Sequence, residues 1–166
     1  MTSLTAYQTI ELVDGDEPED EEWSCSSLPP RRRGRALAFQ ALFELDATRH
    51  NMEDVLEAVL TDSELGPSRE QFTRGLVAGV QANCKDLDVH IQRFAPAWPV
   101  DQLSLVDRCL LRLAVYELTV GCDTSPKIVI NEAVELAKLF GGESSPRFIN
   151  GVLGSLHDSI QSEPKG

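Results

Sequence analysis

Residues 104–119 read SLVDRCLLRLAVYELT. Apolar side chains recur there every three or four residues, at Val106, Leu110 and Leu113. Further apolar residues flank this repeat at Leu111, Ala114 and Leu118. This is the spacing of one helical face, and the flanking residues make that face broad. The stretch therefore predicts a helix at the centre of a helical core, with Gly121 available to terminate it.

The same periodicity continues on both sides of this stretch. Asn51 can cap a helix that starts at Met52, and Ser68 with Gln71 matches a capping box. Ser145-Pro146 likewise opens the last pattern. The predicted helices cover about residues 35–49, 51–65, 68–94, 104–119, 128–140 and 145–160. We expect an all-α, compact single-domain bundle of about six or seven helices.

Residues 128–130, Ile-Val-Ile, are the one place where a strand competes with a helix. The residues that follow, Ala133, Val134, Ala137 and Phe140, keep the helical spacing up to the Gly141-Gly142 pair. A helix is therefore favoured.

The negative charge of the chain lies mainly at its N-terminus. The net charge is −12, and residues 1–28 hold eight acids and no Lys or Arg, which leaves 15 basic and 19 acidic residues for the rest. Acidity and few apolar residues give this segment little surface to bury. We expect a disordered acidic tail and Pro-Pro linker at 1–30, a helical domain at 31–162 and a disordered C-terminus at 163–166.

Several functional classes lack support in the sequence. No apolar run approaches the roughly 20 residues of a membrane span, and the N-terminus does not resemble a secretory signal, so a cytoplasmic protein is expected. The four cysteines form no C-x-x-C pair and favour no metal. Glu132 and Glu135 have no nearby histidine, and a helix stop explains Gly141-Gly142 as well as phosphate binding does. We expect neither catalysis nor a cofactor.

The strongest chemical signal is the cluster Arg31, Arg32, Arg33 and Arg35. Guanidinium groups bind phosphates bidentately and stack on bases, which favours a nucleic-acid contact. Cations at the start of a helix are unfavourable unless an anion neutralises them. Phosphate would neutralise them, and so would the acids at 19–22, so charge alone leaves both readings open.

Five blocks carry a resemblance to a known family. They are RRRGRALAFQALF at 31–43, FTRGLVAGV at 72–80, RCLLRLAVYEL at 108–118, PKIVINEAVELAK at 126–138 and FINGVL at 148–153. In this order and spacing they resemble the signature blocks of the NusB transcription antitermination family. The resemblance covers about residues 31–160.

Membership would imply an all-helical fold and a specific set of partners. NusB-type proteins pair with a small-subunit ribosomal protein, NusE, bind a boxA element in single-stranded nascent RNA and join the RNA polymerase antitermination complex. This suppresses premature termination, notably in ribosomal RNA operons. Family members can also self-associate, so a homodimer is a state to test.

The resemblance also assigns roles to individual residues. Arg31, Arg32, Arg33 and Arg35 match the arginine-rich motif and would contact RNA. Phe140 and Phe148 match positions near the RNA path, where a ring can stack on an unpaired base or pack in the core. Ser144 falls where some relatives carry an acid close to RNA. Contacts with the ribosomal protein are not assigned among Glu117, Asp107 and Asp101.

Two other readings remain open. A helical domain similar to NusB occurs at the N-terminus of certain rRNA cytosine methyltransferases, but this sequence shows no glycine-rich Rossmann unit to hold a methyl donor. A protein-only interaction module, whose arginines dock the acidic tail, is the other alternative. Direct RNA titration separates it from the antitermination reading.

Overall fold

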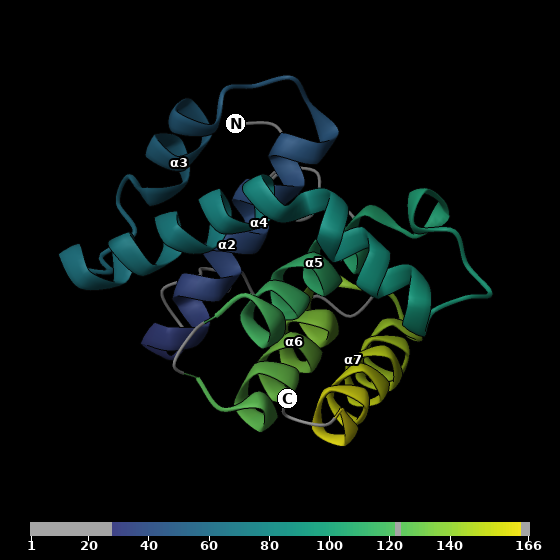
Figure 1. The fold of residues 1–166 in the computed structure, drawn as a ribbon. Coiled ribbons are helices and arrows are strands. Elements are labelled where there is room, and N and C mark those ends of the chain that lie inside the picture. The colour runs from purple at the N-terminus through teal and green to yellow at the C-terminus, as the bar shows by residue number, and fades with distance from the viewer. Residues whose placement is uncertain (1–27, 122–123, 164–166) are drawn as a thin grey trace, which may run out of the picture. The chain divides into compact units, whose positions relative to one another are not determined.

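Helices make up all the regular secondary structure in the computed structural model, which describes residues 28–121 and 124–163 (Figure 1). The elements are α2 (Pro30–Ala47), α3 (Met52–Leu60), α4 (Pro67–Phe94), the 3-10 turn η2 (Val100–Gln102), α5 (Leu105–Thr119), α6 (Pro126–Phe140) and α7 (Ser145–Ser162). The all-α prediction is confirmed. The segments predicted to be disordered are 1–30 and 163–166, and all of their residues except 28–30 and 163 lie outside the described residues.

The chain divides into two compact units, Met1–Gly75 and Leu76–Gly166, with the boundary inside α4. In the first unit α3 packs on α2, and Leu37, Leu60 and Leu65 form a small buried cluster. Asn51 caps α3 as predicted, because its side chain accepts a hydrogen bond of 2.8 Å from the Glu53 amide.

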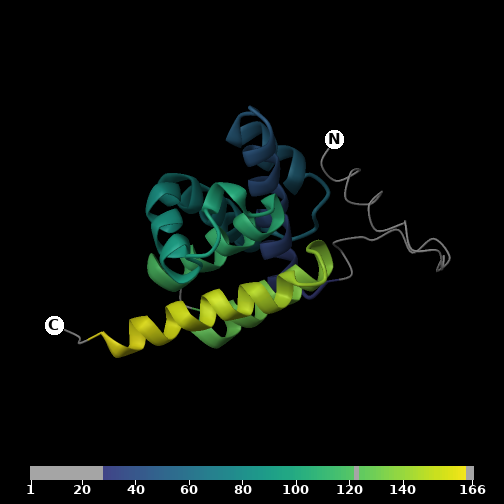
Figure 2. The ribbon, with the colours of Figure 1, turned by 90° about the vertical axis from the view of Figure 1, so that its right-hand side faces the viewer.

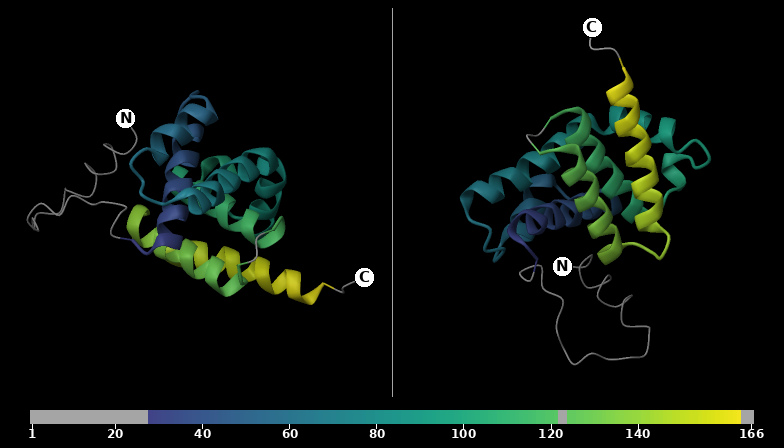
Figure 3. Two further views of the ribbon diagram at one scale, coloured as in Figure 1. Left: turned by 90° about the vertical axis from the view of Figure 1, so that its left-hand side faces the viewer. Right: turned by 90° about the horizontal axis from the view of Figure 1, so that it is seen from below.

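The second unit is built on α5, α6 and α7, which pack on one another. Figures 2 and 3 show α6 and α7 running side by side as a hairpin of helices, joined by the short segment between Phe140 and Ser145. Side chains from all three helices are 0–1% exposed, including Leu110, Leu111, Leu136, Ile149 and Leu153. This confirms that the 104–119 stretch contributes to a core.

An ion pair explains Arg112, one of the four charged residues within the 104–119 stretch. The Arg112 guanidinium donates two hydrogen bonds of 2.8 Å, from Nε and Nη2, to the two carboxylate oxygens of Asp88 on α4. The geometry is bidentate, the strongest form of this pair. Arg112 is therefore a link between α5 and the C-terminal part of α4 within this unit.

Several helix boundaries differ from the predictions. α2 begins at Pro30 and not near Arg35, because a proline at the first position is compatible with a helix start and lets the arginines continue it. α3 ends at Leu60, before the positive φ of Asp62, Glu64 and Gly66. α4 begins at Pro67, so Ser68 lies in its first turn and the capping-box prediction is wrong.

Other boundaries agree with the sequence. Residues 128–130 lie inside α6, which confirms the helix over the strand. α7 opens at the predicted Ser145-Pro146 pair, but Ser145 is its first residue and Ser144 occupies the cap position, so the predicted cap is one residue too late. In the described ranges no helix has both the length and the apolar character needed to cross a bilayer.

Gly79 makes the closest packing contact of a glycine in α4. A Cβ atom at this position would lie 2.2 Å from Tyr116 Cζ and 2.3 Å from its hydroxyl oxygen. At Gly75, one turn earlier on the same helix, an added Cβ would meet no atom within 4 Å. Two glycines of one helix therefore have opposite steric surroundings.

We expect Gly79→Ala to be less stable than Gly75→Ala by about 1–3 kcal/mol in free energy of unfolding. Both changes remove the helix penalty of glycine, but only the first forces the Tyr116 ring to move. Urea denaturation followed by circular dichroism measures the difference. Equal stabilities would show that the ring moves without cost.

Candidate nucleic-acid interface

The first turn of α2 presents Arg31, Arg32 and Arg33, which we call the arginine turn. Arg31 is exposed and the other two are half-buried. This turn contains no acidic residue, and the first helical hydrogen bond runs from the Arg33 amide to the Pro29 carbonyl at 2.8 Å. Three cations thus lie at the positive end of the helix dipole, an arrangement that favours a bound anion.

Contacts within the first unit hold the arginine turn. Thr73, which is fully buried, donates a hydrogen bond of 3.0 Å from its hydroxyl to the Gly34 carbonyl. Gly34 permits this approach, since a Cβ there would lie 3.2 Å from the same hydroxyl oxygen. The Arg33 guanidinium donates to the Leu28 carbonyl at 3.1 Å, which ties the entering chain to the turn.

Arg35 differs from the other three arginines. Its side chain is 3% exposed, and its guanidinium carbon lies 5.3 Å from the centre of the Phe72 ring, within the range of a cation–π contact. The side chain is therefore placed to pack α2 against the start of α4. The structure brings together Arg31, Arg32 and Arg33 in the first turn of α2. Arg35, two residues further along the helix, is buried against Phe72.

The other predicted residues lie in the second unit, in the segment 140–148 that we call the α6–α7 turn. Phe140 is the last residue of α6, and Phe148 lies in the first turn of α7, where its amide donates to the Ser144 carbonyl at 3.0 Å. The turn is closed by two hydrogen bonds of 3.1 Å between Gly142 and Ser145. The structure thus brings Phe140, Ser144 and Phe148 to one short segment.

The side chains of the α6–α7 turn are partly buried and partly exposed, which is compatible both with core packing and with binding of RNA. Phe140 and Phe148 are half-buried, while Ser144 is exposed and its side chain makes no capping hydrogen bond. Arg147 is also exposed in the first turn of α7, which contains no acid. The sequence reasoning missed Arg147 as a candidate, although its position between Ser144 and Phe148 was a usable signal.

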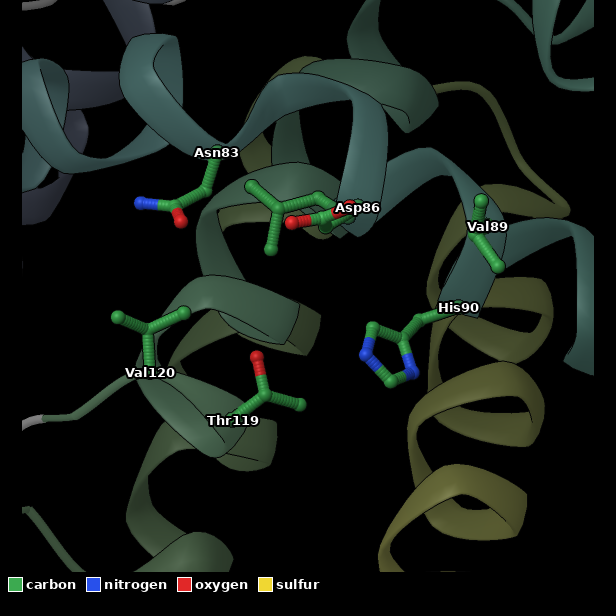
Figure 4. A pocket seen from close by; sticks show the side chains of 7 residues that line it. Asn83, Asp86, Val89, His90, Thr119 and Val120 are labelled. Carbon is green, nitrogen blue, oxygen red and sulfur yellow. The ribbon is translucent and has the colours of Figure 1, made fainter.

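A shallow groove of about 310 Å³ lies elsewhere in the second unit, between α4 and the end of α5 (Figure 4). Val89 and Val120 line it and are 67% and 52% exposed. The rest of its lining includes Asp86 and no Lys or Arg, so the groove is not suited to RNA phosphates. In the described part of the chain no three potential metal ligands are grouped.

An all-helical protein with these motifs matches one family over most of its length. The chain belongs to the NusB family, whose sequence profile matches residues 32–158. A transcription antitermination protein NusB from Dehalococcoides mccartyi is 46% identical over 135 residues, which is 81% of this chain and 94% of that protein. The predicted resemblance is confirmed.

Solved structures agree with this assignment. NusB of T. maritima is 36% identical, with a TM-score of 0.73 over 78% of this chain and 92% of that one. A crystal structure of the antitermination factors NusB and NusE in complex with double-stranded RNA matches with 25% identity and a TM-score of 0.72, over 78% of this chain and 97% of that one. Both support the fold described above.

The two glycines that start the α6–α7 turn provide a test of its geometry. A Cβ on Gly141 would lie 2.6 Å from Ser145 Cβ and 2.8 Å from the Ala137 carbonyl oxygen, whereas a Cβ on Gly142 would meet nothing within 4 Å. We expect Gly141→Ala to lower the free energy of unfolding by about 1–3 kcal/mol, because backbone must shift. Gly142→Ala should change it by less than about 0.5 kcal/mol, as surface changes do.

Thermal unfolding of the two alanine variants measures this difference. If Gly141→Ala unfolds at the same temperature as Gly142→Ala, the turn is not fixed by the close approach of Ser145.

Proposed function

We propose that this protein is an RNA-binding transcription antitermination factor that binds boxA-type single-stranded RNA together with the ribosomal protein NusE. In this role it joins elongating RNA polymerase in the cytoplasm and suppresses premature termination, notably in ribosomal RNA operons. The observation that carries the proposal is the arginine turn, a cluster of one exposed and two half-buried cations at a helix start, in a chain of the NusB family. The NusB–NusE complex with RNA among its structural neighbours supports the choice of partners.

The arginine turn is suited to the RNA backbone. Guanidinium groups present planar sets of donors that match phosphate oxygens, and the helix dipole adds to their attraction. Because the contacts of Thr73 and Arg33 fix the helix start, little order has to be gained when RNA binds. The turn supplies charge, which is independent of base sequence.

The α6–α7 turn is suited to unpaired bases. Phe140 and Phe148 each expose part of a ring, and aromatic rings stack on the bases of single strands. Ser144 can add a hydroxyl donor or acceptor, and Arg147 a further cation. We propose that the α6–α7 turn recognises bases, whereas the arginine turn binds phosphates.

Burial changes the role proposed for Arg35. A guanidinium that is 3% exposed and lies over Phe72 does not reach an RNA strand on the surface. We therefore assign RNA contact to Arg31, Arg32 and Arg33 and a packing role to Arg35. Nothing in this function requires a catalytic step or a cofactor.

The negative charge of the rest of the chain fits a basic protein partner. Potentials of opposite sign steer association and fix orientation, and ribosomal proteins are expected to be basic. We do not assign the NusE-binding surface to any one of Glu117, Asp107 and Asp101. The protein-only module remains the second candidate, and RNA titration tells the two apart.

We expect Arg31→Ala with Arg32→Ala to weaken binding of boxA-type RNA by roughly tenfold to a hundredfold. The salt dependence of binding should fall by about 0.7 in log–log slope for each lost phosphate contact. Fluorescence anisotropy at two salt concentrations, with and without NusE, measures both. Arg49→Ala is the matched control, because Arg49 is exposed and lies just beyond the other end of α2.

The comparison RNA is a scrambled sequence of equal length. Tighter binding of the boxA sequence, strengthened by NusE, supports the proposal. Equal or absent binding of both RNAs in the presence of NusE would instead favour the protein-interaction module.

We expect Phe148→Leu to weaken RNA binding by about 1–3 kcal/mol while Phe148→Tyr changes it little, because only the leucine removes the ring that stacks. Anisotropy titration measures affinity, and urea denaturation of the same samples measures packing. Loss of stability in the leucine variant with no loss of affinity would assign Phe148 to the core.

A further inference from the structure

The arginine turn has a candidate ligand within its own chain. Residues 1–28 hold eight acidic residues and no Lys or Arg, and six of these acids lie between Asp16 and Glu22. The described structure begins at Leu28, only two residues before α2 starts. The acidic segment is therefore joined directly to the end of the helix that carries the three arginines.

The way the chain enters α2 keeps the acidic segment close. The Arg33 guanidinium bonds the Leu28 carbonyl at 3.1 Å, so the point from which the segment extends is fixed at the arginine turn. Glu22 precedes Leu28 by six residues, and a chain of that length spans at most about 20 Å. All three arginines lie on one helical turn, which rises only about 5 Å.

The charge of the turn is complementary to that of the acidic segment. The first turn of α2 has no acidic residue, as is also the case in α6 and α7, but it is the one of these three that carries three arginines. Cations in a first turn are destabilised by the helix dipole, and a neighbouring carboxylate relieves this cost as a phosphate does. A tethered ligand also acts at a high effective concentration.

We propose that the acidic segment 16–22 docks on the arginine turn and competes there with RNA phosphates. The docking is inferred from charge complementarity and from the point at which the segment joins the helix. The competition with RNA rests on the proposed RNA-binding function. RNA must then displace the acids, so the apparent affinity for any RNA is lowered by the fraction of molecules in which the arginine turn is open.

The test uses the full chain with the six acids changed to amides (D16N, E17Q, E19Q, D20N, E21Q, E22Q). The matched control changes six exposed acids elsewhere, Glu57, Asp62, Glu64, Asp86, Asp158 and Glu163, to the corresponding amides, so both variants have the same net charge. We expect the tail variant to bind RNA roughly threefold to thirtyfold more tightly than the control at low salt, the range of three exposed ion pairs. Its salt slope should be steeper by up to about 2, because three arginines then bind phosphates and release the counterions of single-stranded RNA.

A second measurement does not depend on RNA. The side-chain Nε–Hε resonances of Arg31 and Arg32 should shift between the wild type and the tail variant in the absence of RNA, while that of Arg49 should not. Unshifted arginine resonances, or equal RNA affinities of the tail variant and its control, overturn the docking. Shifted resonances in a protein that binds neither RNA would uphold the docking and reject the proposed RNA-binding function instead.

Discussion

The burial of α2 is the constraint on which the arginine turn depends. From Gly34 to Leu42 every residue of this helix is buried, and so is Glu44, two residues further on. Three like charges at the positive end of a helix would fray an isolated peptide, because short helices are marginal in water. Tertiary packing supplies the stability that the first turn lacks. The three arginines therefore remain in helical conformation, although the end of an isolated helix with this sequence would fray.

The same burial shows why part of this helix escaped prediction. Its buried part contains one glycine and three alanines besides larger apolar residues, and it also contains Arg35, Gln40 and Glu44, which a periodicity argument assigns to a polar face. Small residues allow close approach on every side, and long polar side chains can be buried when they have partners. The spacing therefore predicted the helix and one apolar face, but not that the helix is enclosed.

The sequence predicted the two parts of the candidate site, the arginine turn and the α6–α7 turn, to different extents. Arginine clustering located the first turn of α2, because charge is visible in the sequence, whereas the burial of Arg35 over Phe72 needed the fold. The Gly141-Gly142 pair located the α6–α7 turn, but only the structure shows that Gly141 is required by the approach of Ser145 and Gly142 is not. Residue type indicated the chemistry, and packing determined which residues can use it.

The hydrogen bond between Arg33 and the Leu28 carbonyl has a practical consequence for work with this protein. Anything fused to the N-terminus, such as an affinity tag, is joined through residues 1–27 to the point at Leu28 that this hydrogen bond fixes at the arginine turn. A histidine-rich or acidic tag there would alter the local charge. The exposed end of α7 at Ser162 is the better position for purification handles, labels and surface attachment.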